Sequence, residues 1–91
     1  MNKLLITHQS FDDKSATNDV ILSEALGEWI RISRNTYVIE TELTPKELYD
    51  KVSPIFDERD YLRILSLAGP TIGRNQRTVD DWLKARFPLA R

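Results

Sequence analysis

The sequence predicts an α+β domain, because segments typical of strands alternate along the chain with segments typical of amphipathic helices. The strand-like segments, which are apolar or alternate between apolar and polar residues, are 3–7, 29–33, 36–43 and 61–68. The first two helix-like segments, with apolar side chains at helical spacing, are 18–26 and 45–56. The order strand, helix, hairpin, helix, strand is the split β-α-β arrangement of ferredoxin-like domains. We therefore expect a four-stranded antiparallel sheet with two helices on one face, followed by a C-terminal helix over residues 78–87.

The size and composition of the chain predict one small folded domain that spans residues 1–91. Hydrophobic residues make up 41% and charged residues 30% of the sequence, as in ordinary globular proteins. A domain of this length has a thin core, and the absence of cysteine excludes disulfides and thiolate-bound zinc. Because small domains without such cross-links often gain stability by self-association, we expect a homodimer.

The hydropathy pattern predicts a cytoplasmic protein without a membrane partner. The longest apolar runs are too short to span a bilayer, and no signal-peptide cleavage pattern follows the apolar residues 4–6. The formal net charge of −1 argues against bulk electrostatic binding to nucleic acid. It permits a local basic surface, because the 13 Lys and Arg residues can be distributed unevenly.

The second predicted strand has two different faces. Ile30 and Ile32 share one face, and Trp29, Arg31 and Ser33 share the other. The two residues that follow it form a tight turn, so this strand and the next are expected to pair as an antiparallel hairpin. We expect the face with the tryptophan to be the one that the two main helices leave bare, where an exposed aromatic residue indicates a partner surface.

Local signals predict where the second and third helices begin and end. Thr44 and Glu47 have the spacing of a capping box, and Pro45 occupies the first helical position. Pro54 lacks an amide proton and is expected to distort the last turn of this helix. Thr78 is the expected N-cap of the C-terminal helix.

Several segments resemble the small proteins labelled SinR-like, which belong with the CRISPR-associated Cas-two-type proteins. The segments that carry the resemblance are residues 4–7, 27–29, 36–44, 47–52, 60–65 and 81–83. Most of these positions are hydrophobic and determine the fold, so the resemblance is more specific for architecture than for activity. It implies a homodimer of ferredoxin-like subunits.

The same resemblance implies a candidate catalytic position at the end of the first strand. In these proteins an aspartate there, one from each subunit, is proposed to bind a divalent metal for phosphodiester cleavage, and a tyrosine precedes it. In this sequence His8 stands in place of the tyrosine and Gln9 in place of the aspartate. A neutral amide is a poor ligand for magnesium, so we predict that the nuclease activity is lost.

Five further side chains have both a functional and a structural interpretation. His8 is suited to act as a general base, or it is simply a polar residue at a strand end. Asp12 and Asp13 are suited to replace the missing carboxylate, or they are solvated turn residues. Trp29 and Trp82 are suited to stack on bases, whereas hydrophobic packing or dimer burial is the commoner use of tryptophan.

The loop at residues 73–77 is the best candidate for phosphate contact. Arg74 and Arg77 have guanidinium groups that can grip a phosphate, and the following helix begins with free amides. Arg31 and Arg34 are expected to extend this surface. The structural alternative is a polar connector with scattered surface arginines.

Three hypotheses about function follow. The first is a homodimeric, non-catalytic module that binds nucleic acid, a nucleotide or a protein without a cofactor, in a mobile-element or phage-defence setting by analogy with the proteins it resembles. The second is a metal-dependent endonuclease of RNA or DNA, with magnesium or manganese held by Asp12 or Asp13. The third is a small-ligand sensor.

Overall fold

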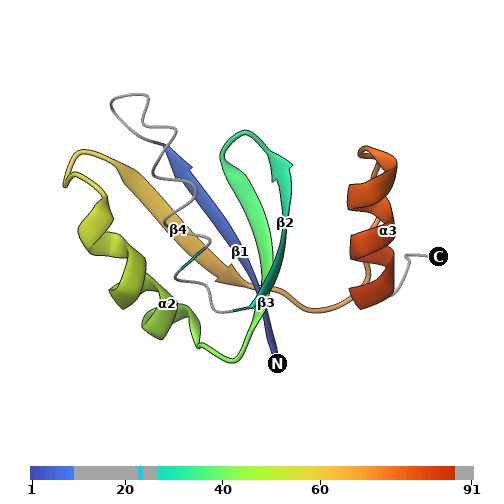
Figure 1. Cartoon of the computed structure of the whole chain (residues 1–91), viewed down its shortest axis with the longest axis horizontal. Coiled ribbons are helices and arrows are strands. Elements are labelled where there is room, and N and C mark those ends of the chain that lie inside the picture. The colour runs from blue at the N-terminus through green and yellow to red at the C-terminus, as the bar shows by residue number, and fades with distance from the viewer. Residues whose placement is uncertain (10–22, 24–26, 88–91) are drawn as a thin grey trace.

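The protein is an α+β structure with a four-stranded antiparallel sheet (Figure 1). The computed structural model describes residues 1–9, 23 and 27–87. The strands are β1 (Asn2–Gln9), β2 (Glu28–Ser33), β3 (Thr36–Thr41) and β4 (Tyr61–Ser66). The helices are α2 (Pro45–Val52), the short 3-10 helix η1 (Ser53–Ile55) and α3 (Arg77–Arg86). The α+β class and the four-stranded antiparallel sheet are confirmed, whereas the helix predicted over 18–26 lies outside the described residues except at Ser23.

The order of the strands in the sheet is β2-β3-β1-β4, and every neighbouring pair is antiparallel. β2 and β4 are therefore the edge strands, and β1 lies between β3 and β4. The end of β1 consequently lies beside the start of β4 and beside the turn that joins β2 to β3. Within the described part of the chain, no helix is long and apolar enough to cross a membrane.

The core lies between α2 and one face of the sheet, which we call the α2 face. Leu4 pairs with Ile39, and Ile6 pairs with Tyr37, so alternate residues of β1 and β3 point to this side. The six fully or almost fully buried side chains of the core cluster are Leu4, Ile6, Tyr37, Ile39, Leu48 and Val52. Apolar burial of this kind is the main stabilising contribution to the fold.

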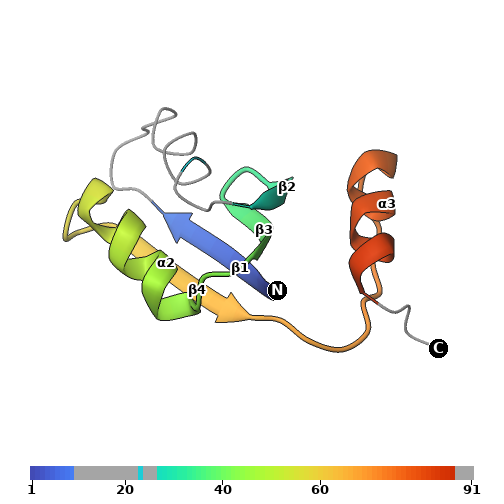
Figure 2. The same ribbon diagram turned by 60° about the horizontal axis from the view of Figure 1, so that its bottom comes forward.

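Helix α3 packs against the opposite face, which we call the α3 face. Figures 1 and 2 show it well separated from α2, on the β2 side of the sheet. Leu83 and Phe87 line a cavity of about 210 Å³ together with Leu5 and Val38 of the sheet. The ammonium group of Lys3 lies 5.2 Å from the centre of the Phe87 ring. The α3 face is therefore covered at this end by a small number of apolar contacts.

A single arginine near the end of α3 adds charged contacts to this attachment. The guanidinium of Arg86 donates a hydrogen bond to the carboxylate of Glu28, and its Nε lies 3.8 Å from a carboxylate oxygen of Glu40. It also stacks over the Trp82 ring, 3.8 Å from the ring centre. Only 17% of the Arg86 side chain is exposed, so these contacts are partly shielded from solvent.

The structure corrects the expected placement of Trp29 and Arg31. Trp29 pairs with Ile39 and Arg31 pairs with Tyr37, which places both on the α2 face. The Trp29 and Tyr37 rings meet edge to face with 6.3 Å between their centres. Ser33 does point to the opposite face, because the register of β2 shifts between Arg31 and Ser33. The reason for the error is that alternation shows which residues share a face but not which face a helix covers.

The ends of the helices agree with the sequence in one case and differ in the other. The capping box of α2 is confirmed: Glu47 N donates to Thr44 Oγ1 at 3.2 Å, and Thr44 N donates to Glu47 Oε1 at 3.0 Å. As predicted from Pro54, α2 gives way to the 3-10 turn η1. The predicted cap at Thr78 is wrong, because α3 begins one residue earlier, at Arg77, with Gln76 as its N-cap.

We expect the capping box to contribute pH-dependent stability. Thr44→Ala is expected to lower the free energy of unfolding by about 1 kcal/mol. The hydrogen bonds from Thr44 lower the pKa of Glu47 from its ordinary value of 4.5. Because the folded-state pKa is the lower one, the ionised form stabilises the protein above about pH 4.5, and this contribution is lost as pH falls through the folded-state pKa. Urea denaturation at several pH values checks this: the deficit of Glu47→Gln relative to wild type should shrink in acid, and a constant deficit would contradict it.

Candidate functional site

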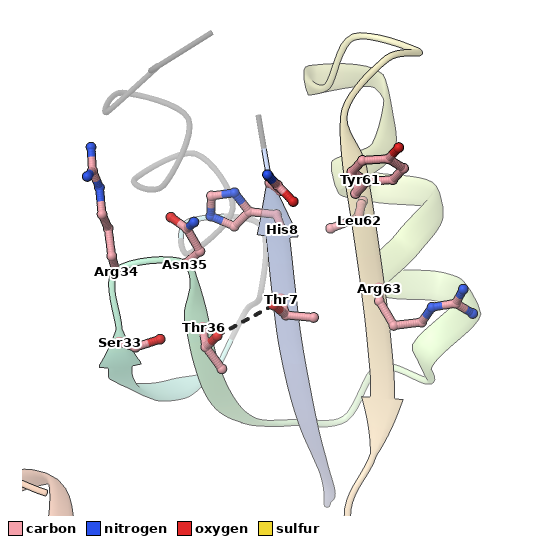
Figure 3. Close-up of a pocket in the computed structure, with 10 residues that line it drawn as sticks. Thr7, His8, Ser33, Arg34, Asn35, Thr36, Tyr61, Leu62 and Arg63 are labelled. Carbon is pink, nitrogen blue, oxygen red and sulfur yellow. Dashed lines mark hydrogen bonds between the residues drawn. The ribbon is translucent and has the colours of Figure 1, made fainter. Parts of the chain in front are cut away.

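A pocket of about 570 Å³ lies at the end of the sheet where β1 finishes (Figure 3). It is lined by residues from the end of β1, from the turn between β2 and β3 and from the start of β4. These residues are Thr7, His8, Gln9, Ser33, Arg34, Asn35, Thr36, Tyr61, Leu62 and Arg63. The strand order brings these segments together although they are far apart in the sequence.

Within the pocket, one row of polar side chains crosses all four strands on the α3 face of the sheet. Thr7 pairs with Arg63 on one side and with Thr36 on the other, and Thr36 pairs with Ser33. The hydroxyl of Thr36 donates to the hydroxyl of Thr7 at 3.5 Å (Figure 3). The pocket therefore offers hydroxyl groups in its middle and guanidinium groups near its two ends.

Arg34 lies in the turn between β2 and β3, and Arg31 holds this turn. Arg31 Nε donates to the Ser33 carbonyl at 3.2 Å, and its Nη2 donates to the Arg34 carbonyl at 3.0 Å. The Arg31 guanidinium also lies 5.9 Å from the centre of the Tyr37 ring. Arg31 therefore positions the backbone that carries Arg34.

The charge of the pocket is one-sided. Among its described lining residues, Arg34 and Arg63 carry positive charge and none is aspartate or glutamate. The remaining polar groups of the lining are hydroxyls, amides and the His8 imidazole. Such a lining favours an anion with several acceptor oxygens, because guanidinium groups donate to phosphate through two parallel hydrogen bonds.

His8 and Gln9 occupy different environments at the end of β1. Only 7% of His8 is exposed, and its ring stacks with Tyr37 (6.2 Å between ring centres, 8° between planes) and contacts Phe56 (5.5 Å). A reactant in solvent has little access to an imidazole packed in this way, which favours the structural interpretation of His8. Gln9 is exposed and pairs with Tyr61 of β4.

The other predicted residues lie apart from this pocket. Arg74 is exposed, and Arg77, whose side chain is 94% exposed, has its Nε 3.9 Å from a carboxylate oxygen of Asp81. Neither arginine is among the described lining residues of this pocket. Asn75 and Gln76 of the same loop do lie near Arg31 and Ser33, with which they line a second pocket of about 230 Å³. Trp82 is partly buried beneath Arg86.

The candidate metal ligands Asp12 and Asp13 lie outside the described residues. In residues 1–9, 23 and 27–87, no group of three or more His, Asp or Glu side chains is arranged to hold a metal ion. The nuclease and small-ligand hypotheses stay predictions.

Two residues that line the pocket, Tyr61 and Arg63, were not among the predicted site residues. A signal for both is present, because alternation along β4 places Tyr61, Arg63 and Leu65 on one face. What the sequence lacks is the position of that face next to the end of β1, which depends on the pairing of β4 with β1.

Comparison of the chain with models of known protein families finds no match, and comparison with curated protein sequences finds none either.

Proposed function

We propose that this protein is a non-catalytic module that binds the phosphate groups of nucleic acid at the pocket beside the end of β1. The observation that carries this proposal is the lining itself. Arg34 and Arg63 stand near its two ends, hydroxyl groups lie between them, and no carboxylate occurs among the described lining residues. This arrangement supplies several hydrogen-bond donors for phosphate oxygens.

The spacing of the two arginines favours an oligonucleotide over a single nucleotide. Arg63 lies on edge strand β4, whereas Arg34 lies in the turn after the other edge strand, β2. Neighbouring strands are about 4.8 Å apart, so the two Cα positions are separated by roughly two to three strand spacings. Figure 3 shows the two guanidinium groups pointing in different directions. Successive phosphates of an extended chain fit this layout better than the phosphates of one nucleotide.

We also propose that the chain has the ferredoxin-like arrangement. The order β2-β3-β1-β4 supports this, because a split β-α-β unit leaves one strand position between the two strands that it joins. The likeness to SinR-like and Cas-two-type proteins, the homodimer and the cytoplasmic location stay predictions.

Binding of labelled oligonucleotides at increasing salt tests the proposed function. If two arginines contact two phosphates of a single strand, log K should fall against log salt concentration with a slope of about −1.4, since each contact contributes about −0.7. Fluorescence anisotropy between 50 and about 300 mM salt measures this slope. Absence of binding at the lowest salt would contradict the proposal. Binding whose affinity does not depend on salt would show that the arginines do not contact the phosphates.

A further inference from the structure

Tyr61 is the first residue of β4 and is unusually exposed for an aromatic side chain. Of its surface 72% is accessible, against 47% for Tyr49 on α2 and 43% for Trp29. It lines the pocket and extends from the edge strand near the end of β1 (Figure 3). A large ring exposed beside two cationic side chains has a flat surface available for a planar ligand group.

The neighbours of Tyr61 have the chemistry needed to hold a nucleotide around such a stacked base. Gln9 is directly opposite Tyr61 in the register, and its amide is both a donor and an acceptor for the edge of a base. Arg63 is two residues further along β4 on the same face, about 7 Å away at the usual rise of a strand. This distance matches the size of one nucleotide, so a base on Tyr61 places an adjoining phosphate within reach of Arg63.

Stacking on Tyr61 requires an unpaired base, which favours single-stranded over duplex nucleic acid. In a duplex each base is stacked on both sides within the helix, so its flat surface cannot cover a tyrosine ring on a protein surface. An unpaired base has this surface available, and stacking on an aromatic side chain is how sequence-tolerant single-strand binders gain affinity. The polar row between Arg63 and Ser33 then accommodates the backbone that leads to Arg34.

Building on the proposed function, we propose that the pocket selects single-stranded nucleic acid, with one unpaired base stacked on Tyr61. Gln9 contacts the edge of this base, and Arg63 holds the phosphate next to it. Selection for the single strand therefore comes from Tyr61, whereas the arginines contribute affinity for any phosphate backbone.

The test compares the affinities of Tyr61 variants for a fluorescein-labelled single-stranded oligonucleotide of mixed sequence and for the matching duplex. Tyr61→Ala should lose about 10-fold or more in affinity for the single strand and little for the duplex. Tyr61→Phe should keep wild-type affinity, because the ring is retained. Tyr49→Ala is the matched control, since it removes an exposed tyrosine from α2, away from the described lining of the pocket.

The outcomes separate this inference from the proposed function. Selective loss in Tyr61→Ala with retention in Tyr61→Phe supports base stacking. If Tyr61→Ala binds the single strand like wild type while loss of Arg34 and Arg63 weakens binding, stacking is overturned and the phosphate-binding function stands. Equal losses on single strand and duplex also overturn the inference. If Tyr61→Ala instead dissociates a dimer without changing affinity for the oligonucleotide, Tyr61 packs against a second copy of the chain and the inference fails. No binding by wild type overturns both proposals.

Discussion

The charge reversals Arg34→Glu and Arg63→Glu together are expected to lower affinity for a single-stranded oligonucleotide by at least about 100-fold. In the proposed complex each arginine donates a charge-assisted hydrogen bond to phosphate, which is worth about 1.5–3 kcal/mol, and a tenfold change in affinity corresponds to about 1.4 kcal/mol. The introduced carboxylates also repel the backbone, so the loss should exceed that of the two alanine variants. Anisotropy titrations at about 100 mM salt, below the range in which screening removes the effect, measure this loss.

A control with the same change in net charge distinguishes the pocket from a general electrostatic effect. Lys46 and Lys51 are exposed on α2 and are not among the described residues that line the pocket. Lys46→Glu with Lys51→Glu should therefore reduce affinity far less than the reversal of Arg34 and Arg63. Similar losses in the two double variants would show that net charge, and not this pocket, determines binding.

Leu48→Ala is expected to cause the largest loss of stability among single substitutions in α2. Leu48 is completely buried between α2 and the sheet, where it belongs to the core cluster. Truncation of a buried leucine costs about 2–5 kcal/mol through lost apolar burial and the cavity that remains. A domain of this size has a total stability of roughly 5–14 kcal/mol, so this substitution removes a large share of it.

Urea denaturation followed by circular dichroism measures the effect of Leu48→Ala. Lys51→Ala, three residues further along the same helix, is the control, because Lys51 is exposed and its truncation should change stability by less than about 0.5 kcal/mol. Equal midpoints for the two variants would contradict the assignment of Leu48 to the core.

The parts of the fold that could be predicted are those that neighbouring residues determine. The turn at 34–35, the capping box at Thr44 and the change of helix type near Pro54 each depend on a few adjacent side chains, and the structure has all three. The start of α3 could not be predicted from Thr78. At this end of α3 the Asp80 carboxylate accepts a hydrogen bond from the backbone N–H of Asn75. The side chain that makes this contact therefore belongs to the first turn of the helix and not to the N-cap residue.

The candidate site was predictable only in part, for a related reason. The resemblance singled out Gln9 at the end of the first strand, and Arg34 stands in a turn that the local pattern identifies. Tyr61 and Arg63 join them only because β4 pairs with β1, which is a property of the tertiary fold. Arg74 does not line the pocket, although sequence alone made the loop at 73–77 the strongest candidate.

The attachment of α3 makes the two faces of the sheet unequal in their resistance to local opening. The α2 face is closed by a cluster of fully buried side chains, whereas α3 follows the long connection 67–76 and is held by a few apolar side chains and the Arg86 contacts with Glu28 and Glu40. Ionic contacts weaken as salt rises, whereas the buried cluster does not depend on them. Release of α3 therefore costs less free energy than global unfolding, and amides of α3 should exchange with solvent before those of β1 and β3. Because Leu5 and Val38 line one cavity with Leu83 of α3, release of this helix would widen the apolar surface of the sheet without unpairing its strands.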